Sequence, residues 1–145
     1  RELLLCPQER ASKIEAYLRT ADNIFVPPLS THLDLSAYAE KISRYGHVLW
    51  AVQNRQNVGM CAFYANCLPE AYLTSLSTLA PFQRTGIGTE LLQYIKAWCR
   101  DRQFLKIKLE VYQANIGAQR LYQHAGFEVI ESRGEKWVMR AIWFR

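Results

Sequence analysis

The apolar residues of this chain recur with two periods, which predict where strands and helices alternate. Residues 71–79 are rich in apolar and β-branched side chains, as strands are, and Ala80 and Pro81 end the run. Downstream, apolar side chains recur every three or four positions, the spacing of one helical face; they are Ile87, Leu91, Leu92, Ile95 and Trp98. A strand is therefore predicted to lead into a long amphipathic helix.

The same periods predict the rest of the fold. Residues 8–20 form a first helix, and a second helix begins near Asp34 or Ser36 and ends at Gly46. Further strands are expected at residues 3–5, 47–53, 58–65, 104–111 and 136–143. We expect a single domain over residues 1–145 with an α/β (α+β sandwich) fold around one mixed, mostly antiparallel sheet.

Two glycines, Gly86 and Gly88, occupy the junction between the strand and the long helix. Because a glycine has no Cβ, the backbone can turn tightly there and approach a ligand. The free N–H groups of the first helical turn and the positive end of the helix dipole would point at that ligand, so a pyrophosphate is expected. A Walker loop is excluded because Thr89 and Glu90 follow Gly88, and a dinucleotide fingerprint is excluded because residue 91 is Leu. An ordinary glycine-containing turn remains the alternative on this motif alone.

A second segment, residues 104–127, gives this junction a context. Residues 83–88 read Q-x-x-G-x-G, and residues 109–127 read L-E-V-x-x-x-N-x-x-A-x-x-L-Y-x-x-x-G-F. In this order and spacing the motifs resemble the GNAT superfamily of acyl-CoA-dependent N-acetyltransferases, over roughly residues 47–142. The catalytic half is most similar to the small bacterial enzymes that include the ribosomal-protein N-terminal acetyltransferases. The resemblance implies a GNAT-like sheet of about seven strands flanked by about four helices, with transfer of an acetyl group from acetyl-CoA to a primary amine.

The resemblance also implies where acetyl-CoA binds. Backbone N–H groups of the glycine loop would hold its pyrophosphate, and the edge of the preceding strand would pair with its pantetheine arm, which Asn115 would contact while also capping a helix. The positions implied are Leu76, Ser77, Thr78, Arg84, Thr85, Gly86, Ile87, Gly88, Thr89 and Asn115. Thr78 stands where the family usually has an aliphatic residue, and Pro81 lies one residue later than is common. We expect these departures to alter the bulge in the strand without removing its hydrogen-bonding edge.

Tyr122 and Glu110 are the candidate catalytic residues. Tyr122 matches the family tyrosine that approaches the thioester sulfur, and a phenol (pKa ~10) stays protonated until a thiolate (pKa ~8.5) departs. Packing within the helix is the alternative for this side chain. Glu110 lies on the polar face of its strand, at the end where ligands gather in α/β sheets, and would act as the base. An ion pair with Lys108 or Arg120 is the alternative, and Glu70 or water could supply the base instead.

The acceptor amine is expected to bind between two loops. The resemblance places acceptor contacts in residues 25–32 and in the turn of residues 132–135. Two consecutive prolines stiffen the first loop, which suits a lid over a small molecule better than a clasp around an extended chain. A small-molecule amine is therefore the leading prediction, a protein or peptide amine the second, and a non-catalytic acyl-CoA-binding or nucleic-acid-binding module the third. Candidates for lining the acceptor pocket are Phe25, Leu29, Tyr64 and Tyr72.

The net charge of +5 falls entirely in the second half of the chain. Residues 1–70 carry seven basic and seven acidic side chains, whereas residues 71–145 carry eleven and six. This excess would attract an anionic cofactor. No nucleic-acid partner is predicted, because the cations are spread over solvated faces without interleaved aromatic residues; they include Lys96, Arg100, Arg102, Lys106 and Lys108.

The remaining composition points to the cytoplasm. No apolar run approaches the ~20 residues that a membrane span requires, and no signal sequence is recognisable. The cysteines show neither C-x-x-C spacing nor a grouping with the histidines, so buried, reduced thiols and no metal are expected. We therefore expect a soluble protein with no membrane partner, as a monomer or homodimer. The cysteines are Cys6, Cys61, Cys67 and Cys99.

Overall fold

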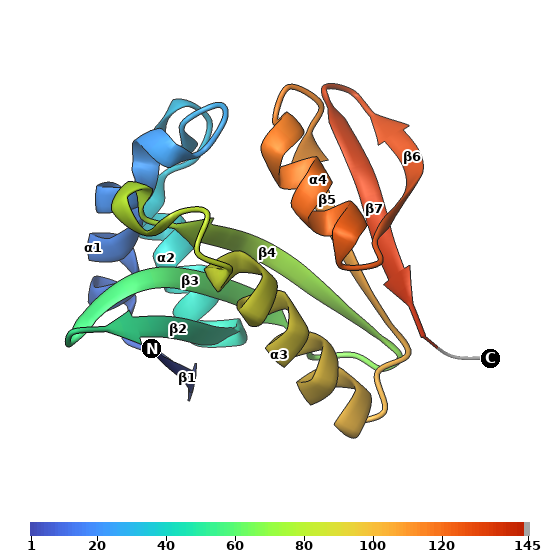
Figure 1. The fold of residues 1–145 in the computed structure, drawn as a ribbon, viewed down its shortest axis with the longest axis horizontal. Coiled ribbons are helices and arrows are strands. Elements are labelled where there is room, and N and C mark those ends of the chain that lie inside the picture. Colours follow the sequence, from blue (N-terminus) through green and yellow to red (C-terminus); the bar gives the residue numbers. More distant parts are fainter. Residues whose placement is uncertain (144–145) are drawn as a thin grey trace.

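Seven strands form one sheet in the computed structural model, which describes residues 1–143 (Figure 1). The strands lie in the order β1-β2-β3-β4-β5-β7-β6. Their bounds are β1 (Glu2–Pro7), β2 (His47–Gln53), β3 (Gln56–Tyr64), β4 (Glu70–Thr78), β5 (Lys106–Tyr112), β6 (Glu128–Arg133) and β7 (Lys136–Ile142). Neighbouring strands are antiparallel except for β4 and β5, which are parallel. The predicted mixed, mostly antiparallel sheet is confirmed.

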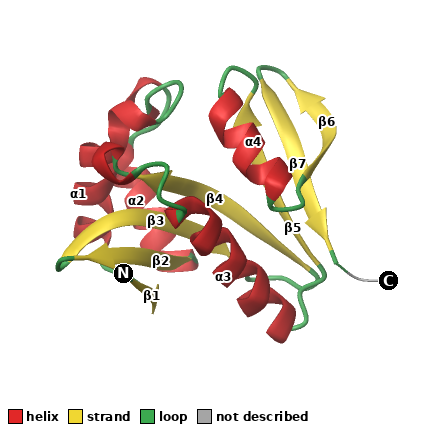
Figure 2. Cartoon of the chain, in the orientation of Figure 1, coloured by secondary structure: helices red, strands yellow, loops and turns green. Residues whose placement is uncertain are grey.

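Within the described residues, four α-helices cover the two faces of the sheet (Figure 2). They are α1 (Ala11–Ala21), α2 (Leu35–Tyr45), α3 (Ile87–Asp101) and α4 (Ile116–His124). Burial of apolar side chains holds them there, at about 1.5–3 kcal/mol for each fully buried one. The core under α1 and α2 includes Ile14, Leu18, Ile42 and Trp50. The core under α3 and α4 includes Leu91, Ile95, Leu109, Tyr122 and Phe127.

The longest helix, α3, has 15 residues. A helix that crosses a bilayer needs about 20 predominantly apolar residues. Within residues 1–143, no helix combines the length and the apolar character that such a crossing demands.

A capping side chain accounts for where α2 begins, whereas the backbone conformation before α1 delays its start. Asp34 caps α2, because its Oδ1 accepts a hydrogen bond from the Ala37 N–H at 3.1 Å, so Asp34 rather than Ser36 has this role. α1 begins at Ala11, later than the predicted start. The reason is Gln8, whose left-handed φ of 58° cannot be part of an α-helix.

The four cysteines differ in exposure. Cys61 and Cys99 are buried, as predicted. The prediction of burial is wrong for Cys67, which is exposed in the loop between β3 and β4, and for Cys6, which is partly exposed on the edge strand β1. All four are free thiols.

β4 and β5 pair along only a short stretch. Glu70 lies beside Lys106, and the last pair joins Tyr72 to Lys108. Beyond this point the two strands diverge, as Figure 1 shows. A strand without a neighbour presents unpaired backbone N–H and C=O groups. The later part of β4 is therefore an open edge inside the fold.

β4 also carries a bulge at Thr74, the residue left without a partner in the register with β3. Because side chains alternate between the faces of a sheet, one extra residue changes which positions face each core. Leu73 packs under α3 before the bulge, and Leu76 packs there after it. Ser77 instead faces α1, where its Oγ lies 2.9 Å from the Tyr17 hydroxyl. The bulge thus sets the direction of every residue on the open edge.

Gly59 of β3 lies under the start of α3, and its replacement by Ala should destabilise the protein. A Cβ at this position would lie 2.9 Å from Cγ2 of Ile87 and 3.3 Å from the Ser77 carbonyl oxygen. Such overpacking typically costs about 1–3 kcal/mol, so the midpoint of denaturant unfolding should fall. The control is Gly117→Ala in α4, where the new Cβ meets nothing within 4 Å and the midpoint should hold or rise. Equal midpoints for the two variants would contradict this prediction.

Candidate functional site

Two cavities lie along the open edge of β4. The first, which we call the tyrosine cavity, has a volume of about 240 Å³; four of the residues that line it are Tyr38, Tyr72, Tyr112 and Tyr122. The second, the glycine-loop cavity, has a volume of about 520 Å³ and extends from residues 76–78 to the start of α3. The cavities meet at the residues that line both, which are Phe25, Leu76, Asn115 and Ala118.

The glycine loop turns into α3 at one end of the glycine-loop cavity. Gly86 has φ of 88°, a left-handed value that favours glycine. The first hydrogen bond of the helix runs from the Glu90 N–H to the Gly86 carbonyl, at 3.0 Å. Within the part of the chain that the structure describes, the N–H groups of residues 87–89 meet no acceptor. These groups and the helix dipole are suited to bind a phosphate.

Nine of the ten predicted cofactor positions line the glycine-loop cavity. The exception is Thr85. Its hydroxyl donates to the Phe82 carbonyl at 2.6 Å, which turns the side chain back toward its own loop. Asn115 caps α4, since its Oδ1 accepts from the Ala118 N–H at 3.1 Å, and it lies where the two cavities meet.

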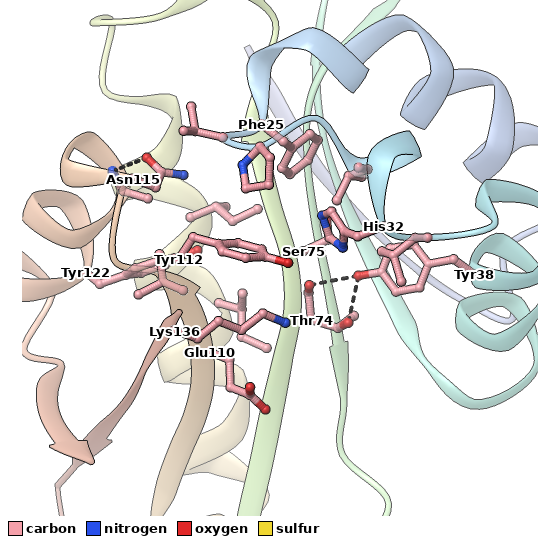
Figure 3. A pocket seen from close by; sticks show the side chains of 18 of the residues that line it. Phe25, His32, Tyr38, Thr74, Ser75, Glu110, Tyr112, Asn115, Tyr122 and Lys136 are labelled. Atoms are coloured by element: carbon pink, nitrogen blue, oxygen red, sulfur yellow. Dashed lines mark hydrogen bonds between the residues drawn. The ribbon is translucent and has the colours of Figure 1, made fainter. Parts of the chain in front are cut away.

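Tyr122 extends from α4 to the wall of the tyrosine cavity (Figure 3). The residue is only 6% exposed, and its ring packs edge-on against Phe127 with the ring centres 5.7 Å apart. Burial raises the pKa of its phenol above the ordinary value. The hydroxyl therefore keeps its proton at neutral pH and is available as a donor.

Glu110 lies in the same cavity, at the end of β5. Its Oε2 accepts a hydrogen bond from the Tyr72 hydroxyl at 3.3 Å and faces Arg133 at 3.4 Å. Arg133, not Lys108 or Arg120, is thus the basic partner of this carboxylate. Burial first, and then the negative charge of Glu110, raise the pKa of Tyr72 to about 12.

Glu70, the other candidate base, lies outside the lining of the tyrosine cavity. It belongs to the paired end of β4, where its Oε2 accepts from Arg140 Nε at 2.8 Å. The parallel pairing with β5 keeps this carboxylate away from the open edge.

The predicted acceptor residues divide between the cavity and the core. Phe25, Leu29 and Tyr72 line the tyrosine cavity. Tyr64 does not, because it packs against the core under α1 and α2. The turn of residues 132–135 is also absent from the lining and reaches the site only through Arg133.

Two further residues line the tyrosine cavity without a sequence motif to mark them, Tyr112 and Lys136. Tyr112 lies two residues beyond Glu110, so the alternation of the strand places both on one face, a signal that the sequence contains. Lys136 is the first residue of β7, and the register of β5 with β7 sets it opposite Tyr112. Its Nζ lies 4.9 Å from the centre of the Tyr112 ring.

Comparison with known proteins gives this arrangement a family. Residues 14–127 match the model of the acetyltransferase (GNAT) family. N-alpha-acetyltransferase 50 from Danio rerio is 41% identical over 63 residues, which cover 43% of this chain and 38% of that protein. The probable N-acetyltransferase san of Drosophila melanogaster is 35% identical over 63 residues, which cover 43% of this chain and 34% of that protein. The match therefore spans only about a third of the length of these curated relatives.

Solved structures share the fold at low identity. The PaiA N-acetyltransferase from Thermoplasma acidophilum, in complex with coenzyme A, has a TM-score of 0.79 at 15% identity, over 99% of this chain and 100% of that one. A GNAT family acetyltransferase from Elizabethkingia anophelis with acetyl-CoA bound has a TM-score of 0.75 at 14% identity, over 97% and 98%. Ribosomal-protein-alanine N-acetyltransferase from Brucella melitensis has a TM-score of 0.73 at 18% identity, over 97% and 99%. These likenesses confirm the predicted fold.

Replacing Gly86 with Val should abolish the binding of coenzyme A. A residue with a side chain at left-handed φ costs about 1–2 kcal/mol, and a branched side chain on the cavity wall would keep a phosphate from the free N–H groups. The control is Gly134→Val, which imposes similar strain at φ of 60° in the turn before β7 and should bind normally. Calorimetry measures both affinities. A folded Gly86→Val variant with unchanged affinity would contradict phosphate binding at this loop.

Proposed function

The chain belongs to the acetyltransferase (GNAT) family, and from this premise we propose that it transfers an acetyl group from acetyl-CoA to a primary amine. The observation that carries the proposal is the meeting of the two cavities at Leu76 and Asn115. One cavity offers a helix start suited to phosphate, and the other offers a buried phenol and a carboxylate. Acetyl-CoA bound across the junction would have its phosphates in the glycine-loop cavity and its reacting thioester carbon beside the tyrosine cavity.

The glycine-loop cavity is the proposed site for the donor. The free N–H groups of residues 87–89 would bind the pyrophosphate. The edge of β4 at residues 76–78 would pair with the pantetheine arm as an added strand, and an N–H there would polarise the thioester oxygen. The Thermoplasma and Elizabethkingia proteins share this fold and bind coenzyme A and acetyl-CoA, which supports acetyl-CoA as the donor.

Tyr122 is the proposed acid. When the amine displaces sulfur, the thiolate needs a proton, and the Tyr122 hydroxyl in the cavity wall carries one at neutral pH. Its place in the lining, close to the junction, supports this role. A module that only binds acyl-CoA would have no use for an acid here, so this arrangement favours an enzyme.

Glu110 is the proposed base. The attacking nitrogen must be neutral, and a carboxylate in the same cavity could accept its proton directly or through one water. Tyr72 donates to this carboxylate and, with a pKa of about 12, stays protonated, so it orients Glu110 rather than acting as the base. Glu70 is less suitable because it is paired with Arg140 away from the cavity.

A small-molecule amine is the proposed acceptor. The tyrosine cavity, at about 240 Å³, is below the ~300–1,000 Å³ common for drug-sized ligands. Phe25, Val26, Pro27 and Leu29 form part of its wall, as expected of a stiff loop that encloses a small guest.

A peptide or protein amine is the second candidate. A similarity to curated relatives favours it. N-alpha-acetyltransferase 50 is named for modifying α-amino groups, and it matches this chain at 41% identity over the aligned segment. The first residue of a peptide could fill the tyrosine cavity while the rest of the peptide lay outside.

Location in the cytoplasm is proposed with either acceptor, since free thiols are typical of a reducing compartment.

A thiol-release assay over amino sugars, polyamines, amino acids and short peptides tests the proposal. We expect a higher kcat/KM with at least one small amine than with any peptide. Turnover confined to peptides would favour the second candidate. No turnover with any amine, by folded protein that binds acetyl-CoA, would overturn the transferase itself.

Tyr122→Phe should lower kcat by roughly 10²-fold or more, the range expected on losing one positioned acid. The affinity for acetyl-CoA should remain nearly intact, because only the hydroxyl is removed. Steady-state kinetics and calorimetry measure the two quantities. Tyr94→Phe, on α3 outside both linings, is the control and should keep its activity. Wild-type turnover in Tyr122→Phe would assign this residue to packing.

Glu110→Gln should flatten or shift the rise of activity with pH. In the wild type the rate should increase with pH until the amine and its base are both deprotonated. The amide cannot accept a proton, so the variant should depend on the amine alone. Profiles of kcat/KM against pH show the difference, with Glu131→Gln as a control because Glu131 also pairs with Arg133 but lies outside the cavity lining. Superimposable profiles for Glu110→Gln and the wild type would rule out this base.

A further inference from the structure

Lys136 is a charged residue of the tyrosine cavity that the proposed chemistry does not use. Its Nζ lies over the ring of Tyr112. Within residues 1–143, no carboxylate lies within ion-pair distance of this ammonium. Glu110, the carboxylate that lines the cavity, faces Arg133 instead. Lys136 therefore has no ion-pair partner among the described residues.

His32 faces the same space from the opposite wall. It follows the short helix Leu29–Thr31 and packs edge-on against Tyr112, with the ring centres 5.2 Å apart. Figure 3 shows the His32 ring and the Lys136 side chain extending into the cavity from different elements. His32 lines the cavity but remains exposed to solvent, and partial desolvation first and then the charge of Lys136 lower its pKa.

The position of this charge restricts which amines fit. A polyamine would bring a second ammonium toward Lys136, and two like charges in a partly enclosed space repel each other. A group of negative charge would instead neutralise the ammonium and accept charge-assisted hydrogen bonds from it. The Tyr112 ring satisfies Lys136 only in part, because a cation–π contact leaves the N–H donors unused.

We propose that the acceptor amine carries an anionic group, a carboxylate or a phosphate, which Lys136 and His32 bind in the tyrosine cavity. The inference rests on the proposed transferase function and narrows its acceptor. The amine would lie toward Leu76 and Asn115, where the two cavities meet, and Glu110 would accept its proton through one water. The anion would lie against Lys136 and His32. A volume of about 240 Å³ suits a compact acceptor such as an amino acid or an amino sugar phosphate, or the first residue of an acidic peptide.

Matched acceptor pairs test this inference. Each pair keeps the amine and changes the charge: an amino acid against its amide, glucosamine 6-phosphate against glucosamine, and a peptide with an acidic first residue against the corresponding amide. The pairs also separate a carboxylate from a phosphate. The wild type should favour the anionic member of at least one pair by roughly 10-fold or more in kcat/KM, the range expected for a hydrogen bond to a charged group.

Variants of Lys136 then assign the preference to this residue. Lys136→Met should raise KM for the anionic acceptor by roughly 10-fold or more and leave the neutral acceptor unchanged. Lys136→Arg should retain most of the preference for the anionic acceptor. If Lys136→Met does not fold, Lys136→Gln is used in its place. Lys108→Met is the control, because Lys108 lies on β5 outside both linings and should behave as the wild type. Equal use of both members of every pair by the wild type, or equal losses on both in Lys136→Met, would overturn the inference.

Calorimetry decides the outcome if no amine is turned over. Acetate and inorganic phosphate are titrated into protein loaded with coenzyme A. Binding that is present in the wild type and in Lys108→Met but lost in Lys136→Met would support the anion site while overturning the transferase. No binding of either anion to the wild type would overturn both.

Discussion

The short parallel pairing of β4 and β5 is the constraint on which the rest of the site depends. The ladder ends at Tyr72 and Lys108, and the strands then diverge. Before that point the backbone N–H and C=O groups of the two strands form hydrogen bonds with each other. Beyond it the edge of β4 is open to a ligand. Both cavities lie along this open edge, and the residues that they share form the proposed meeting point of the thioester and the amine. A longer ladder would close this space with backbone.

Two tyrosines from the opposite core, one buried and one partly buried, hold this open edge in place. Tyr38 of α2 donates to the Thr74 carbonyl at 2.8 Å, at the bulge, and the Tyr17 hydroxyl of α1 lies 2.9 Å from Ser77 Oγ. Burial raises the pKa of both phenols, to about 12 for Tyr17, so they remain neutral hydrogen-bonding groups near neutral pH. The helices on one face of the sheet therefore fix the geometry of a strand edge that serves the site between β4 and β5.

The sequence determined the local elements of this protein and the parts of the site that lie within one of them. Apolar periodicity located α3 and the strands on either side of it, because burial of one face follows directly from the spacing of side chains. The glycine loop was recognisable because a left-handed φ at Gly86 and a close approach to a ligand both require the absence of Cβ. Glu110 and Tyr122, the proposed base and acid, could be singled out because they belong to one strand-to-helix motif with fixed spacing.

Tertiary structure alone decided what these residues meet. The partner of Glu110 is Arg133, which lies 23 positions away and reaches it across β7, and Lys136 faces Tyr112 only through the register of β5 with β7. Tyr64 packs against the core and Tyr72 lines the cavity, although both are tyrosines on neighbouring strands and the sequence made both candidates for the acceptor pocket. Such outcomes depend on strand order, register and the bulge at Thr74, which result from packing the whole sheet between its helices. Periodicity within a single segment carries no information about them.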